Sequence, residues 1–343
     1  MSILPGDGRC FLICEAGVTN YGELELARRQ IDVAVAAGVD AIKFQAWDTA
    51  ELVSRSEAAR LQDELGYDWF ARMEERRLDW DELRELQRYA VERGLLFFAA
   101  AHDDTALRFI VEELDVPILK VGSGESANER FLRQVGAAGK PVLVSFGLQT
   151  DEEVVHAVET LREAGAPEIV AFHCVSVYPT PYKLVDLDRV ERLRALTSVP
   201  VGLSDHSIGS HVCLAAVARG AAAIEKHLTF DKADPRSLDN PGAFEPEELV
   251  AFVREVRELE LALRPPPAAE LAAALAHARD WATQAIVAAR TLPSGHVLRD
   301  EDLALKRPAR GGLPPAALAE LVGRSVRRDI AADEQLRLAD LAD

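Results

Sequence analysis

The chain has 343 residues, of which 48% are hydrophobic and 28% charged, the composition of a globular protein with room for one large domain and one small one. The formal net charge of −18 argues against a nucleic acid or a membrane surface as a partner, so any phosphate must be bound by a few local lysines and backbone amides. Four cysteines without a CxxC motif, and the lack of a predicted signal peptide or membrane span, lead us to expect a cytoplasmic protein with buried thiols.

Short apolar runs typical of buried strands alternate with amphipathic helical segments along most of the chain. The predicted strands cover residues 10–15, 41–45, 95–101, 118–122, 141–145, 169–174, 199–204 and 222–227. The predicted helices cover residues 23–37, 79–93, 104–113, 129–136, 151–164, 186–195, 210–219 and 245–260. This alternation predicts an α/β protein with a (β/α)8 TIM barrel, and a doubly wound open sheet is the alternative.

Two segments fall outside this repeat. Residues 47–78 are longer than an ordinary connection, and we expect them to form extra helix over the barrel mouth. The proline-rich start of residues 264–282 predicts a linker followed by an alanine-rich helix, and residues 283–343 read as a small β-rich domain. The predicted barrel domain therefore comprises residues 1–263.

Polar side chains collect where the predicted strands end, which is where a barrel of this type places its active site. His206 and His227 each close an apolar run, and on neighbouring strands they could share one divalent metal; singly, each could be a hydrogen-bonded core histidine. Lys43 and Lys120 suit a phosphate dianion, and Glu15 could position or deprotonate a water molecule. The other polar residues at these ends include Gln45, Ser123, Glu125, Ser145, Tyr178 and Ser204.

Six motifs at the strand ends resemble the sialic acid synthase family. They are Cys14-Glu-Ala-Gly-Val, Ala41-Ile-Lys-Phe-Gln, Leu119-Lys-Val-Gly-Ser-Gly-Glu, Pro179-Thr-Pro, Leu203-Ser-Asp-His and Ile224-Glu-Lys-His-Leu-Thr. The tail, with Leu305-Lys-Arg-Pro and Leu321-Val-Gly-Arg, is similar to the antifreeze-like SAF domain of that family. The resemblance covers nearly the whole chain.

This resemblance implies an enzyme that condenses phosphoenolpyruvate with an amino-sugar aldehyde such as N-acetylmannosamine and releases phosphate. A divalent metal, Mn²⁺ or Mg²⁺, is expected on His206 and His227. A domain-swapped homodimer is also implied, in which one SAF domain covers the partner's barrel. Phosphoenolpyruvate is expected at Lys43, Lys120, Ser123, Ser145 and Ser204, and the acceptor at Gln45, Glu125, Tyr178, Asp239 and Arg307.

The chain also departs from the family pattern. Ala100 and Val177 replace residues with polar side chains, and the loop Thr19-Asn20-Tyr21 differs from the family's first loop. His102 and Arg236 are candidates to replace the lost phosphate contacts. The changed loops after the first, third and eighth strands indicate a different acceptor. Two other functions stay open: a pyruvate aldolase using a Schiff base on Lys43 or Lys120, and a non-catalytic relative that binds a sugar or a partner protein.

Overall fold

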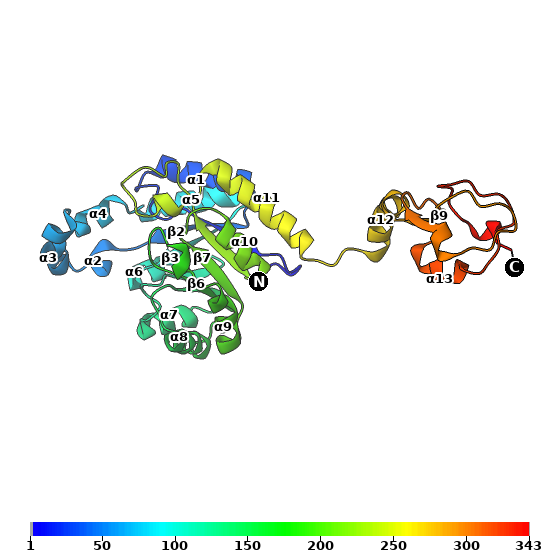
Figure 1. Ribbon diagram of the computed structural model, residues 1–343. Coiled ribbons are helices and arrows are strands. Elements are labelled where there is room, and N and C mark those ends of the chain that lie inside the picture. The colour runs from blue at the N-terminus through cyan, green and yellow to red at the C-terminus, as the bar shows by residue number, and fades with distance from the viewer. Residues whose placement is uncertain (1–2, 343) are drawn as a thin grey trace. The chain divides into compact units, whose positions relative to one another are not determined.

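Eight parallel strands close into a barrel, each hydrogen-bonded to the next along the chain and the last to the first. The computed structural model describes residues 3–342 and confirms the predicted (β/α)8 barrel (Figure 1). The strands are β1 (Phe11–Glu15), β2 (Ala41–Ala46), β3 (Leu96–Ala101), β4 (Leu119–Val121), β5 (Val142–Phe146), β6 (Ile169–Cys174), β7 (Val201–Asp205) and β8 (Ala223–His227).

Helices surround the barrel and cover the outer faces of its strands (Figure 1). Because parallel strands are covered on both faces, their sequences are almost continuously apolar, and every residue of β1, β5 and β8 is buried. The predicted helix over 104–113 is an α-helix only to Arg108 and continues as a π-helical turn over Phe109–Glu113. The covering helices are α1 (Leu24–Ala37), α5 (Trp80–Glu92), α6 (Asp104–Arg108), α7 (Glu129–Ala137), α8 (Asp151–Glu163), α9 (Asp188–Thr197), α10 (His211–Ala218) and α11 (Pro246–Ala262).

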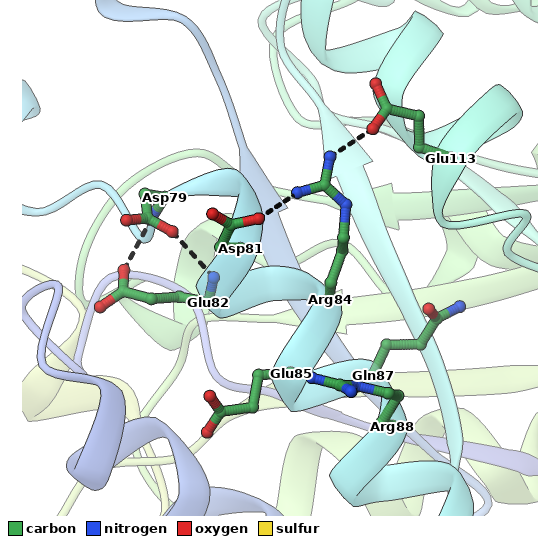
Figure 2. Close-up of a pocket in the computed structure, with 8 residues that line it drawn as sticks. All are labelled: Asp79, Asp81, Glu82, Arg84, Glu85, Gln87, Arg88 and Glu113. Atoms are coloured by element: carbon green, nitrogen blue, oxygen red, sulfur yellow. Dashed lines mark hydrogen bonds and ion pairs between the residues drawn. The ribbon is translucent and has the colours of Figure 1, made fainter.

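Helix α5 begins with a reciprocal cap between Asp79 and Glu82. The Asp79 side chain accepts a hydrogen bond from the backbone N–H of Glu82, and the Glu82 carboxylate accepts one from that of Asp79. Figure 2 shows this cap beside Arg84, which is ion-paired with both Asp81 and Glu113. Asp79, Glu82 and Arg84 in this surface hollow are thus engaged in capping and pairing, which stabilises the start of α5.

The strand register directs a defined set of polar side chains into the barrel. Glu15 on β1 is aligned with Lys43 on β2 and with His227 on β8. Residues two apart on a strand share one face, so Glu225 points to the same side of β8 as His227. Ser204 on β7 is aligned with Glu225. The pairing therefore brings side chains that are far apart in sequence to one end of the barrel interior.

Three short helices interrupt the repeat between β2 and α5, as expected for residues 47–78. They are α2 (Thr49–Leu52), α3 (Arg55–Leu65) and α4 (Trp69–Glu75), and they extend to one side of the barrel (Figure 1). Asp48, Ser54 and Asp68 cap them, each accepting a hydrogen bond from a backbone N–H of the first turn.

The chain divides into two units, the barrel unit ending at Leu263 and a second unit beginning at Arg264. The second unit contains helix α12 (Ala268–Ala282) and an antiparallel pair of strands, β9 (Ala285–Ala288) and β10 (Leu303–Lys306). A small apolar core lies beneath the pair and includes Ile286, Leu298 and Ile330. Short elements complete this unit: α13 (Leu318–Leu321) and 3-10 turns at Asp300–Asp302, Pro315–Ala317 and Leu338–Asp340. Within residues 3–342, no helix combines the length and hydropathy that a membrane span requires.

Candidate active site

A cavity of about 550 Å³ opens at the carboxyl ends of the barrel strands. Every site residue predicted within the barrel lines it, so the structure brings them together in one place. Arg307 follows β10 in the second unit and is exposed to solvent. The predicted residues in the cavity wall are Glu15, Lys43, Gln45, Lys120, Ser123, Glu125, Ser145, Tyr178, Ser204, His206, His227 and Asp239.

A carboxylate that the sequence analysis assigned no role, Glu225, organises the floor of this cavity. Its Oε2 lies 3.0 Å from Lys120 Nζ, and its Oε1 lies 3.8 Å from Lys43 Nζ. Ser204 Oγ donates to the same Oε1 over 2.9 Å, and Lys120 Nζ donates to Ser145 Oγ over 2.7 Å. The signal that could have found Glu225 is its place two residues before His227 on one strand face.

The charges of this network set each other's protonation. Burial alone would raise the pKa of Glu225, but the ammonium groups of Lys120 and Lys43 outweigh burial and hold that pKa well below its usual value. Burial would lower the pKa of Lys43, yet the carboxylates of Glu15 and Glu225 outweigh it and raise the pKa. For Lys120 burial dominates, and its pKa falls below the ordinary value. The floor thus presents two buried amines whose charges are balanced by carboxylates.

Glu15 is completely buried beside this network. Its Oε2 is 2.7 Å from Lys43 Nζ, and its Oε1 accepts a hydrogen bond from Gln45 Nε2 over 2.8 Å. Both carboxylate oxygens are therefore held in place at the cavity wall, next to His227 on the neighbouring strand. A fixed carboxylate in this position suits a group that orients or deprotonates water.

His206 and His227 face each other across the cavity, with ring centroids 5.3 Å apart. His206 Nδ1 donates to the carbonyl oxygen of Val175 over 3.0 Å, which leaves Nε2 as its free nitrogen. Burial, and then the proximity of His227, lower the pKa of His206 to about 4, so its imidazole is neutral near pH 7. His227 Nδ1 is buried without a hydrogen-bond partner and lies 3.8 Å from Asp239 Oδ2.

These two imidazoles fit a divalent cation that keeps open coordination positions. Neutral imidazole nitrogens are common metal ligands. Binding an ion would also satisfy His227 Nδ1, which is buried without a hydrogen-bond partner. The described residues contain no group of three or more His, Cys, Asp or Glu side chains arranged around one point. A cation held here would therefore complete its coordination with water or a substrate oxygen.

The remaining wall mixes aromatic and acidic groups. The Tyr178 ring lies 4.3 Å from the His206 ring, centroid to centroid. Glu125 Oε2 is 3.1 Å from Nδ1 of His102, so His102 belongs to the cavity. Arg236, the other candidate replacement for a phosphate contact, lies outside the wall of this cavity and is ion-paired with Asp234, 2.7 Å from Nη2 to Oδ2.

Of the two departures with lost polar groups, only one affects the cavity. Ala100 is buried, lines the wall and is aligned with Gln45 and Lys120 on the neighbouring strands. Val177 is 43% exposed and lies outside the cavity wall, so the loss of an amide there removes no contact within this cavity. Trp69, Met73 and Arg76 of the α4 region also line the cavity, in agreement with the expected extra helix over the barrel mouth, although none of the three was assigned a role in the site from the sequence.

The fold and the site define a (β/α)8-barrel enzyme with paired lysines and imidazoles in one cavity. Residues 30–265 match the model of the NeuB family, and residues 283–342 match that of the SAF domain, so the chain belongs to the NeuB family. The relatives described next are named as synthases, and the chain is an enzyme of this transferase type. This finding removes the non-catalytic alternative.

Three relatives illustrate the similarity. The chain is 32% identical to the human N-acetylneuraminate-9-phosphate synthase over 96% of its own length and 92% of the relative's. It is also 32% identical to the N,N'-diacetyllegionaminic acid synthase of Legionella pneumophila, with 95% and 93% covered. The crystal structure of an N-acetylneuraminic acid synthetase from Leptospira borgpetersenii in complex with citrate superposes with a TM-score of 0.68 at 31% identity, covering 79% of this chain and 92% of that one.

Proposed function

We propose that this enzyme condenses phosphoenolpyruvate with the aldehyde of a sugar and releases phosphate, giving a 2-keto-3-deoxy sugar acid. The observation that carries the proposal is the convergence of Lys43, Lys120, Ser145 and Ser204 on the cavity floor beside the facing imidazoles. Amines and hydroxyls suit the anionic groups of the donor, and a cation on the imidazoles suits a carbonyl. The synthase names of the relatives support the same reaction class.

The donor would be held by the floor of the cavity. Lys43 and Lys120 supply buried ammonium groups, and Ser123, Ser145 and Ser204 supply hydroxyls that can donate to phosphate or carboxylate oxygens. Glu225 is ion-paired with both lysines and accepts a hydrogen bond from Ser204. Glu225 keeps the two lysines in position, and the donor's negative charge adds to a network that is already balanced. A divalent cation nearby would offset that added charge.

His206 and His227 are the residues that would hold the cation, for which we propose Mn²⁺ or Mg²⁺. When bound, such an ion supplies Lewis-acid polarisation of the acceptor's carbonyl oxygen. The chain's own contribution is to present two nitrogens from β8 and the end of β7 at a fixed spacing, with Tyr178 packed against one ring. Gln45, Glu125 and Asp239 would bind acceptor hydroxyls at the same end of the cavity.

The bond changes balance without a redox partner. Carbon 3 of the enolpyruvyl group forms a bond to the aldehyde carbon, and the aldehyde oxygen takes up a proton to become a hydroxyl. Water adds to carbon 2 and gives a proton to Glu15, which passes it on to the former aldehyde oxygen. The tetrahedral intermediate then loses phosphate by cleavage of the bond between carbon 2 and the bridging oxygen, and the carbon-2 hydroxyl gives its proton to the departing phosphate, which leaves the ketone. The contacts of Lys43 and Gln45 with the two carboxylate oxygens of Glu15 support this role.

We further propose a homodimer in which Arg307 of one copy reaches the acceptor bound by the other. Apolar side chains in the loops around the barrel mouth support an interface there, since Leu148, Ile208 and Leu238 are 66%, 48% and 75% exposed. A second copy covering this rim would exclude water from the reaction and add a cation to the site.

Phosphate release tests the proposed function. The purified protein should release phosphate only when phosphoenolpyruvate, a divalent cation and a suitable aldose are all present. Turnover that continues in excess chelator would contradict the metal dependence, and trapping of pyruvate on Lys43 or Lys120 by borohydride would instead establish the aldolase.

A further inference from the structure

The segment between β2 and α5 carries five arginines. Arg60 and Arg77 are ion-paired, and Arg55 stacks on the Phe70 ring. Arg77 is paired with Glu74 at 3.4 Å, and Arg236 with Asp234 at 2.7 Å. In the described part of the chain, Arg72 and Arg76 form no ion pair, and both donate to the backbone carbonyl oxygen of Arg236.

The positions of these arginines connect them to the proposed active site. Arg76 lines the cavity that contains His227 and Asp239, and it also lines a second hollow of about 540 Å³ together with Arg72. Asp239, on the acceptor side of the proposed site, attracts Arg76 from a longer distance than an ion pair. Arg76 thus stands between the reaction cavity and the hollow beside it.

The two like charges are one helical turn apart, which costs stability unless an anion offsets them. Burial, and then the charge of Arg72, lower the pKa of Arg76. The acidic residues of the hollow do not compensate: Asp68 caps α4 by accepting from the N–H of Ala71, Glu23 lies 3.5 Å from Arg236, and Glu75 is exposed.

Two loops, those after β1 and β8, hold Arg76 in this place. Gly22 packs against the end of α4 so closely that a Cβ atom on it would lie 2.6 Å from the carbonyl oxygen of Glu75. The guanidinium of Arg236 stacks on the Tyr21 ring at 3.6 Å, and the Tyr21 hydroxyl accepts from Asn240 Nδ2 over 2.8 Å. The loops after β1 and β8, where this sequence departs from its family, therefore meet at the two arginines.

We propose that Arg76, with Arg72, binds an anionic group at the end of the acceptor remote from its aldehyde, so that the acceptor is a negatively charged aldose. This inference rests on the proposed function, because it assigns the acceptor's class. Guanidinium groups bind phosphate and carboxylate oxygens in paired hydrogen bonds, so a sugar phosphate and a uronic acid share the required chemistry. The lysines of the cavity floor remain free for the donor.

Binding and turnover with three probes test the inference: N-acetylmannosamine, its 6-phosphate and N-acetylmannosaminuronic acid. We expect at least one anionic probe to bind about 10- to 100-fold more tightly than the neutral sugar, in calorimetry and in KM. The anionic probe that binds more tightly shows whether the charge of the acceptor is a phosphate or a carboxylate. If the neutral sugar binds as tightly as both, the inference is wrong, whether or not any probe is turned over. Absence of phosphate release with every probe would instead contradict the proposed function.

Variants of the two arginines distinguish a role in binding the acceptor from a role in stabilising the fold. Arg76→Gln and Arg72→Gln should remove the preference for the anionic probe, raise its KM about 10- to 100-fold and leave the KM for phosphoenolpyruvate unchanged. Their melting temperatures without ligand should hold or rise, since a like-charge contact is relieved. Arg60→Gln, on the exposed face of α3, is the matched control and should change neither constant. A lower melting temperature with an unchanged preference would show a structural role and overturn the inference.

Discussion

The ammonium group of Lys120 lies 3.0 Å from the carboxylate of Glu225, and both side chains are buried at the centre of the barrel mouth. Glu225 also receives the hydroxyl of Ser204 and faces Lys43, so one carboxylate holds three groups that we assign to the donor. The arrangement explains how two lysines can be buried in one cavity, since the carboxylate offsets the repulsion between their ammonium groups.

Removing the charge of Glu225 tests this arrangement. Glu225→Gln should lower stability by about 3–5 kcal/mol, because it leaves buried ammonium groups without their counter-charge. Phosphoenolpyruvate should then raise the melting temperature of the variant more than that of the wild type, since the donor supplies the missing negative charge. Differential scanning fluorimetry with and without the donor measures both effects. Exposed Glu152→Gln on α8 is the control, and an equal ligand-induced shift in Glu225→Gln and wild type would count against the role of Glu225.

The facing imidazoles predict a metal response. Mn²⁺ should raise the melting temperature of the wild type, and His206→Asn or His227→Asn should abolish the rise and lower activity by at least about 100-fold. His277→Asn, an exposed position on α12, should retain both. If Mn²⁺ still raises the melting temperature of both active-site variants, the ion binds at another site.

Ala100 and Val177 form a matched pair of departures from the family. Ala100→Ser restores a hydroxyl in the cavity wall, where it can donate one hydrogen bond to the phosphate of phosphoenolpyruvate. The KM for phosphoenolpyruvate should therefore fall by about 3- to 10-fold. Val177→Asn should change it little, because that side chain lies outside the cavity wall. Steady-state kinetics measures the KM for phosphoenolpyruvate in both variants. An equal change in the two would contradict the prediction that only a residue in the cavity wall affects donor binding.

The proposed dimer can be tested by complementation. Lys120→Ala and Arg307→Ala should each be inactive alone, yet mixing them under conditions that exchange subunits should restore about one quarter of the wild-type activity, because half of the dimers then carry one intact site. Mixing Lys120→Ala with Ser145→Ala, both on the same barrel, is the control. No recovery in the first mixture, with exchange shown by mass spectrometry, would refute a site shared between copies.

Sequence reasoning predicted the barrel because strand burial and strand order leave a strong periodic signal. It also predicted twelve residues that share the cavity, since the carboxyl ends of barrel strands meet at one rim. The role of Glu225 was missed because it depends on which side chains pair inside the barrel, although its spacing from His227 was informative. Arg76 could not be found because its position depends on how α4 packs against Gly22, a contact without a local sequence pattern. Arg236, a candidate replacement for a phosphate contact, lies outside the cavity wall and is ion-paired with Asp234, a pairing that no pattern in the sequence predicts.

The most direct test of the account uses phosphoenolpyruvate labelled with ¹⁸O in its bridging oxygen, supplied with Mn²⁺ and a panel of neutral and anionic aldoses. The proposed reaction should release phosphate that carries the label, only when an aldose is consumed, together with a product enlarged by the three carbons of pyruvate. Phosphate without the label, or release that does not depend on the aldose, would contradict it.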